Sequence, residues 1–110
     1  MGKRSQRKGR SGEIELTRIL NDSGIAAVPG KPCNLGTTPD VMGVPGIHCE
    51  VKRVERLNIS EAMRQAVSDA EKFNDGLPTV FHRRNRQSWL VTMRLDDWIR
   101  LYRGKHEDIS

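Results

Sequence analysis

Two acidic residues and a lysine are spaced so that they could hold a divalent cation beside a reacting phosphate. Asp40 follows a proline, and Glu50 and Lys52 lie beyond a Pro45-Gly46 turn. Residues two apart in a strand project to the same face, so a strand here would place Glu50 and Lys52 side by side. If the turn closes a hairpin, Asp40 comes close to Glu50. The register of that hairpin is not readable from the sequence.

This group of residue types is suited to phosphodiester hydrolysis. Two carboxylates held close together repel each other unless a cation neutralises them, and oxygen ligands of this kind favour Mg²⁺ or Mn²⁺. Such an ion lowers the pKa of a bound water and stabilises charge on phosphate oxygens. Lys52 could position or deprotonate the attacking water, or stabilise the developing negative charge. A Glu50–Lys52 pair on a solvated strand face would need no catalysis, and that interpretation stays open.

Glu13 would join this group from a helix predicted over residues 9–23. The apolar stripe of that helix consists of Leu16, Ile19 and Leu20. At about 100° per residue, Glu13 lies roughly 65° from the centre of the stripe, at the edge of the buried face, where its carboxylate could enter a cleft. Glu15 lies about 95° away on the other flank, which favours a solvated or ion-paired residue.

Hydrophobic periodicity and turn residues predict the remaining elements. Strands are expected at residues 25–28, 40–44, 47–53, 77–82 and 88–92, with a loop over 29–39. A helix capped by Asn58 and ended by Asn74-Asp75-Gly76 separates the third strand from the fourth, and a short helix over 95–102 comes last. The order α-β-β-β-α-β-β-α predicts an α/β fold in which helices flank a mixed central sheet.

The size of the chain favours one domain. Of its 110 residues, 9–103 are expected to form that domain, 1–8 a flexible basic arm and 104–110 a loose C-terminal tail. No apolar run approaches the roughly 20 residues needed to cross a bilayer, and no apolar stretch follows the basic start as it would in a secretory signal. We therefore expect an intracellular, cytoplasmic protein without a membrane partner.

The positive charge is clustered. The net charge is +5 and the pI about 9.7. Lys8 and Arg10 belong to one cluster, and Arg83, Arg84 and Arg86 to another. Clusters of this kind suit a polyanion, because each phosphate contact releases condensed counterions. A basic surface is also often no more than a solvated face, so the charge by itself favours nucleic acid only weakly.

Several segments in order resemble one known family. These are Lys8–Leu16, Pro39–Met42, Glu50–Lys52 and Gly76–Pro78 followed by Trp89. Over roughly residues 8–93 the chain resembles the PD-(D/E)xK nuclease superfamily, and within it the archaeal-type Holliday junction resolvases and related phage nucleases. The resemblance implies a restriction-endonuclease-like fold, a Mg²⁺ (or Mn²⁺) cofactor, branched or junction DNA as substrate, and a homodimer.

The resemblance also implies roles for particular residues. Glu13, Asp40 and Glu50 become acidic metal-site residues, Lys52 the catalytic lysine, and the Val51 main-chain carbonyl a further metal ligand. Gln65, thirteen residues after Lys52, matches a glutamine that some of these nucleases use near the site. The expected DNA contacts are Lys8, Arg10, Thr38, Arg53, Arg83, Arg84 and Arg86.

Two departures leave the DNA substrate open. Ile14 stands where the family often has an arginine, and Thr37 and Thr38 only approximate a serine that is common in the resolvases. The leading hypothesis is a metal-dependent, structure-selective endonuclease, most of all a Holliday junction resolvase. One alternative is a nuclease or nickase for other DNA structures in phage replication or repair, which would be phage-encoded and act in a bacterial host. Another is a non-catalytic DNA-binding protein that retains the fold.

Three further residues invite a functional interpretation, but each has a structural one that we favour. His48 shares the predicted face of Glu50 and Lys52 and could contact DNA or a metal-bound water, yet a hydrogen-bonded strand histidine is the better interpretation. Trp89 and Trp98 occupy apolar-patterned segments, so we expect both in the core rather than as platforms for stacked bases.

Overall fold

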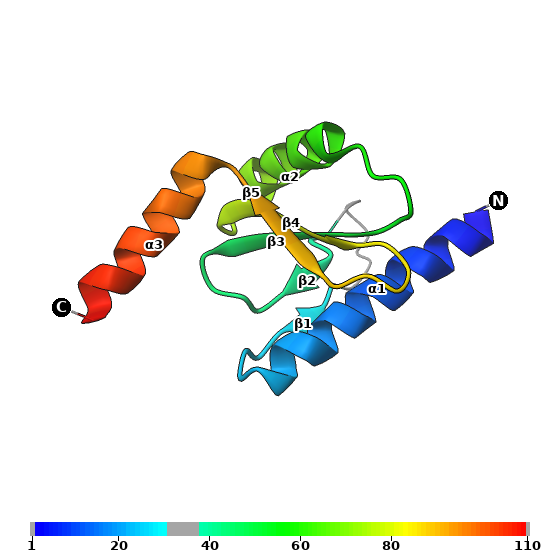
Figure 1. Cartoon of the computed structure of the whole chain (residues 1–110), viewed down its shortest axis with the longest axis horizontal. Helices are drawn as coiled ribbons and strands as arrows, with labels where there is room; N and C mark the ends of the chain where they lie inside the picture. Colours follow the sequence, from blue (N-terminus) through cyan, green and yellow to red (C-terminus); the bar gives the residue numbers. More distant parts are fainter. Residues whose placement is uncertain (1, 31–37, 110) are drawn as a thin grey trace.

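The computed structural model describes residues 2–30 and 38–109, and the side chains of residues 10–30 and 38–104. Its elements are α1 (Gly2–Asp22), β1 (Val28–Pro29), β2 (Val41–Met42), β3 (Ile47–Arg53), α2 (Ile59–Phe73), β4 (Leu77–Arg83), β5 (Leu90–Met93) and α3 (Leu95–Ile109), as Figure 1 shows. The predicted order of elements and the predicted mixed sheet flanked by helices are both confirmed. No described helix is long and apolar enough to cross a membrane.

The five strands form one sheet in the order β1-β2-β3-β4-β5. β3 and β4 are parallel along their whole length, from Ile47 opposite Leu77 to Arg53 opposite Arg83, and the other neighbours are antiparallel. A parallel pair requires a crossover, which α2 provides. Figure 1 shows α2 on one side of the sheet and α1 on the other.

The two faces of β3 are buried under different helices. Cys49 and Val51 belong to a core cluster that includes Leu16 of α1. On the other face, α2 and Val80 of β4 form a second cluster, whose helix residues are Ala62 and Ala66. Because side chains alternate along a strand, Glu50, between Cys49 and Val51, points toward the α2 side, together with Val80. The sheet therefore carries Glu50 into the layer beneath α2.

The ends of α2 form as the sequence predicts. The backbone N–H of Glu61 donates to the side chain of Asn58 at 3.1 Å, and Asn74 ends the helix in the left-handed region at φ 49°. Gly76 follows at φ +135°, where a Cβ would lie 2.3 Å from the carbonyl carbon of Gly46. Only glycine lets the start of β4 approach the β2–β3 turn so closely.

Some predicted boundaries are wrong. α1 begins at Gly2, so the segment expected to be an arm is helical, and α3 continues to Ile109 instead of ending near residue 102. Lysine, arginine and glutamine have high helix propensity and neither segment contains proline, so nothing stops either helix. The first strand lies at Val28–Pro29 instead of 25–28, because local hydrogen bonds from Ile25 to Leu20 and from Ala27 to Ile25 keep the preceding residues in a turn.

The expectation for the two tryptophans is right for one of them. Trp89 packs against the core cluster under α1. Trp98 is 48% exposed and stacks on Tyr102 with ring centroids 5.3 Å apart, so it is not a core residue. The physical reason is the position of α3, which extends away from the sheet in Figure 1 and leaves this apolar stripe on its surface.

Glu15 joins α1 to β4 and to the segment before β5. Arg83 donates from Nε and Nη2 to the two carboxylate oxygens at 2.6 and 2.8 Å, and Trp89 Nε1 donates to Oε1 at 2.7 Å. The hydrogen bond from Arg83 is the main cause that lowers the pKa of Glu15. The sequence predicted that Glu15 is either solvated or ion-paired, and the structure confirms the ion pair.

We expect Glu15→Ala to destabilise the protein by about 1–3 kcal/mol, because it leaves the Trp89 N–H and the Arg83 guanidinium without their acceptor. Thermal unfolding should show a Tm lowered by roughly 4–8 °C for each kcal/mol lost. Glu71→Ala, at an exposed position of α2, is the matched control and should leave the Tm nearly unchanged. Equal Tm values for the two variants would contradict this role of Glu15.

Candidate active site

The register of β2 and β3 places Asp40 directly across from Glu50. Val41 pairs with Cys49 in the antiparallel ladder, so the residue before Val41 lies opposite the residue after Cys49. The Oδ2 atom of Asp40 accepts a hydrogen bond of 2.8 Å from the backbone N–H of Val51. Glu50 is only 4% exposed. The question of register that the sequence left open is answered by this pairing, which makes the two carboxylates neighbours.

The electrostatics of Asp40 reflect this crowding. Burial is the main cause that raises its pKa to about 7, and the charges of Glu50 and Glu13 raise it further, while the Val51 N–H and Lys52 lower it. A carboxyl group with so high a pKa lacks enough positive charge around it to hold its ionised form. An oxygen-binding divalent cation would supply that charge, so the donor set fits Mg²⁺ or Mn²⁺.

Lys52 lies beside Glu50, near the C-terminal end of β3 and on the face of the sheet that α2 covers. Its Nζ is 3.6 Å from Glu50 Oε2 and donates to Gln65 Oε1 of α2 at 3.2 Å. The side chain is 29% exposed, so the ammonium group reaches the surface. Its contacts with Glu50 and Gln65 keep it in position. The structure therefore brings together three of the residues selected from the sequence: Glu50, Lys52 and Gln65.

Glu13 approaches the same group from α1. Burial is the largest influence and raises its pKa, Arg10 lowers it, and the charge of Glu50 raises it again. Arg10 Nη1 is 3.4 Å from Glu13 Oε2 and also donates to the carbonyl oxygen of Gly30 at 2.9 Å. With 19% of its side chain exposed, Glu13 lies at the edge of the site. Three acidic side chains and one amine thus converge.

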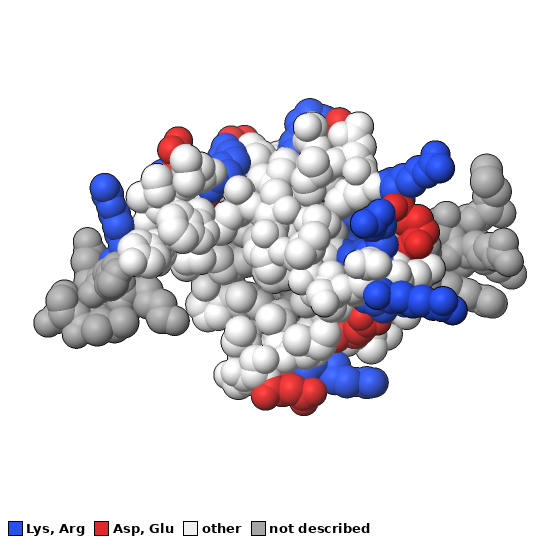
Figure 2. Space-filling model, viewed as in Figure 1, with Lys and Arg blue, Asp and Glu red and all other residues white. Residues whose placement is uncertain are grey.

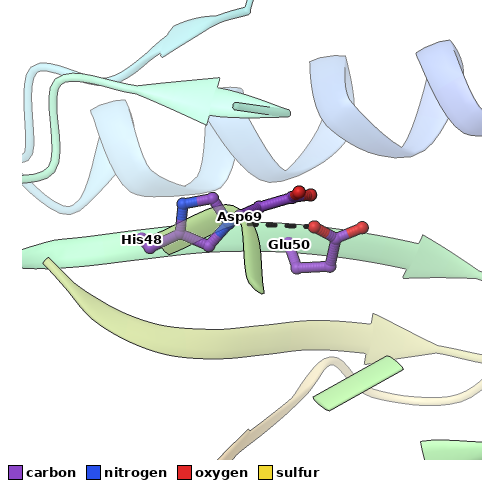
Figure 3. Close-up of side chains that lie close together, drawn as sticks. All are labelled: His48, Glu50 and Asp69. Carbon is purple, nitrogen blue, oxygen red and sulfur yellow. Dashed lines mark ion pairs between the residues drawn. The ribbon is translucent and has the colours of Figure 1, made fainter. Parts of the chain in front are cut away.

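Sequence reasoning missed two acidic residues near His48. His48 is 1% exposed, and its Nδ1 is 2.9 Å from both carboxylate oxygens of Asp75. This confirms the interpretation as a hydrogen-bonded strand histidine. Asp69 of α2 lies close to His48 and Glu50 (Figure 3). Its spacing of four residues from Gln65 was a usable signal, because residues four apart share a helix face. Asp75 gave no such signal, since its position depends on the parallel pairing of β3 and β4.

The charge state of His48 is set by these neighbours. Burial lowers its pKa, but the neighbouring carboxylates of Glu50 and Asp75 raise it by more, so the net shift is upward. The Nε2 atom is 3.8 Å from Glu50 Oε1. Glu50 therefore presents one oxygen to His48 and the other to Lys52.

The residues expected to contact DNA differ in their exposure and in whether they already have a partner within the protein. Arg84 and Arg86 are exposed in the β4–β5 turn, and Figure 2 shows basic side chains gathered at that end of the molecule. Arg83, with 13% of its side chain exposed, is bonded to Glu15, and Arg53 donates to Ser11 Oγ at 3.2 Å. Arg10 is exposed and Thr38 half-buried, while the side chain of Lys8 and the whole of Thr37 lie outside the described residues.

An open groove of about 510 Å³ lies between the β3–α2 connection and the β4–β5 turn. Its lining includes Arg56 from the β3–α2 connection and Arg84 from the β4–β5 turn. The parallel register places Lys52 opposite His82, which also lines this groove. The exposed arginines and the catalytic candidate therefore lie at the same end of β3 and β4.

The mixed sheet with α1 and α2 on opposite faces is the restriction-endonuclease-like fold that the resemblance predicted. Among solved structures, the chain is similar to Hjc, a Holliday junction resolvase from the archaeal hyperthermophile Archaeoglobus fulgidus, with a TM-score of 0.56 and 22% sequence identity. The similarity covers 76% of this chain and 74% of that chain. No protein-family model and no curated protein matches the sequence. At this level of identity the likeness shows a shared fold.

Proposed function

We propose that the protein is a divalent-cation-dependent DNA endonuclease that cuts branched DNA, most of all Holliday junctions. The observation that carries this proposal is the convergence of Glu13, Asp40 and Glu50 with Lys52, in which Asp40 lies opposite Glu50 across β2 and β3. The resolvase-like fold supports the same chemistry. A DNA substrate also implies that the protein acts inside a cell.

In this proposal Mg²⁺ or Mn²⁺ is held by Asp40, Glu50 and the main-chain carbonyl of Val51, with Glu13 at the edge. The ion would supply Lewis-acid chemistry, lowering the pKa of a water and stabilising charge on phosphate oxygens. Lys52 places a positive charge where negative charge develops on the phosphate during cleavage. Gln65, which accepts from the Lys52 ammonium group at 3.2 Å, keeps that group in position.

DNA would be gripped mainly by the exposed arginines at the β4–β5 end. Arg84 and Arg86 are available there, and Arg56 adds a third guanidinium on the other wall of the groove. We also propose DNA contacts from the other residues that the sequence indicated: Lys8, Arg10, Thr38, Arg53 and Arg83. Because phosphate contacts release counterions, binding should weaken steeply with salt.

Symmetric cutting of a four-way junction needs two active sites, so we propose a homodimer. The apolar residues Leu95, Trp98 and Leu101 of α3 are 47–68% exposed and offer a surface for the second copy. Asp96 and Arg103 lie on one flank of this helix, about two helical turns apart. In an antiparallel pair of α3 helices, Asp96 of each copy would meet Arg103 of the other.

The decisive experiment offers the pure protein a panel of DNA substrates in Mg²⁺, Mn²⁺ and Ca²⁺. The panel contains a four-way junction, a flap, a nicked duplex and a linear duplex. We expect cleavage of the junction at paired positions in Mg²⁺ or Mn²⁺, and binding without cleavage in Ca²⁺. Preferential cutting of a flap or nicked duplex would instead identify a nuclease for other DNA structures. That alternative is included because Ile14 and Thr38 depart from the residues common in the resolvases. Binding with no cleavage of any substrate would identify a non-catalytic DNA-binding protein.

A further inference from the structure

We propose that His48, Glu50 and Asp69 form a second cation site, distinct from the one around Asp40, for an ion that accepts an imidazole ligand, such as Mn²⁺. One ligand atom from each of these residues lies within 4.8 Å of the other two. Figure 3 shows the three side chains together, with Asp69 reaching in from α2. Glu50 belongs to both sites, but the proposal does not depend on nuclease activity.

The buried Nε2 atom of His48 is the independent observation that points to a ligand. Among the described side chains, it is one of two buried polar atoms without a hydrogen-bond partner. A buried polar atom left in this state costs about 1–3 kcal/mol, so native proteins rarely tolerate one without a reason. The Nε2 atom lies 3.8 Å from a carboxylate oxygen of Glu50, which is too far for a hydrogen bond.

The other side of the imidazole ring is arranged as it is in known metal-bound histidines. Nδ1 is 2.9 Å from both oxygens of Asp75, so its N–H donates to that carboxylate, and in the neutral ring the lone pair is on Nε2, which faces Glu50. A carboxylate on the far nitrogen fixes the tautomer and raises the basicity of the metal-binding nitrogen. Phe73 holds the ring from its face, with ring centroids 6.4 Å apart and planes 10° from parallel.

The separation of His48 Nε2 and Glu50 Oε1 suits a first-row divalent cation. With metal–ligand bonds of about 2.1 Å, a separation of 3.8 Å between Nε2 and Oε1 corresponds to an angle of roughly 130° at the metal. One nitrogen and two carboxylate groups favour Mn²⁺ or Zn²⁺ over Mg²⁺, which prefers oxygen ligands only. Asp69 is half-buried, and one of its carboxylate oxygens lies within 4.8 Å of the ligand atoms of His48 and Glu50.

Mn²⁺ titration with an electron spin echo readout tests this site directly, because the method detects a coordinated imidazole nitrogen. The Asp40→Asn variant is the starting protein, since it weakens the oxygen-only site. We expect Mn²⁺ to bind with nitrogen coupling from one histidine. Adding His48→Gln should abolish the coupling, and adding Asp69→Asn should weaken Mn²⁺ binding at this site by at least about 10-fold.

Glu71→Gln, at an exposed position of the same helix, is the matched control and should leave both the affinity and the nitrogen coupling unchanged. If His48→Gln does not fold, the Asp69→Asn result decides. Absence of nitrogen coupling, coupling that persists without His48, or unaltered affinity in Asp69→Asn would overturn the proposal. A protein that cuts no DNA but shows the expected coupling would refute the proposed function while supporting this site.

Discussion

Lys52→Met is expected to lower the rate of DNA cleavage by about 10²–10³-fold, the usual effect of removing one group that stabilises charge in the transition state. The ammonium group of Lys52 lies 3.6 Å from Glu50 and is held by Gln65, so methionine removes the charge while keeping most of the side-chain volume. Binding of junction DNA in Ca²⁺ should change by less than the cleavage rate, because the exposed arginines supply most phosphate contacts. Single-turnover cleavage and a binding titration, made on the same preparation, measure the two effects separately.

Arg18→Met removes an exposed positive charge from α1 and serves as the control for the loss of net charge. It should cut DNA at nearly the wild-type rate. Full activity of Lys52→Met in a preparation free of contaminating nuclease would exclude the proposed role of the lysine. A parallel loss of binding and of thermal stability would show that Lys52 is structural instead.

Asp40→Asn is expected to make the metal-free protein more stable at pH 8 and to abolish most of the stabilisation by Mg²⁺ or Mn²⁺. The pKa of Asp40 is raised from 3.8 to about 7, mainly by burial. The folded state therefore holds a proton that the unfolded state has already released, and the stability linked to that proton is lost as the pH rises from about 4 to above 7. Asparagine carries no charge to repel Glu50 and can still accept from the Val51 N–H.

Thermal unfolding in EDTA, repeated across this pH range, measures the effect. We expect a Tm about 4–8 °C above that of the wild type at pH 8, as a gain of about 1 kcal/mol would give, and a difference that shrinks toward pH 4. In Mg²⁺ the order should reverse, because only the wild type gains from binding the ion. If Asp40→Asn has a Tm below the wild-type value at pH 8 in EDTA, the carboxylates of Asp40 and Glu50 do not destabilise the metal-free protein, and the prediction is wrong.

The local features of the site could be read from the sequence because they depend on short-range geometry. Glu50 and Lys52 share a face through the two-residue period of a strand, and the ends of α2 follow from the chemistry of Asn58 and Asn74. The family resemblance, not local geometry, placed Gln65 near the site, and its side chain is hydrogen-bonded to that of Lys52. The extensions of α1 and α3 were missed because helix ends with no stop residue have no local signal.

The sequence by itself determined the order of elements, the alternation along β3 and the residue types that make a cation site plausible. Only the tertiary structure decided that Asp40 lies opposite Glu50, that Arg83 binds Glu15, and that Asp75 and Asp69 surround His48. Each of these contacts joins residues on different elements, so it depends on strand register and on the parallel pairing of β3 with β4. Local propensity carries no information about such pairings, because they are selected by how the faces of the sheet pack against α1 and α2.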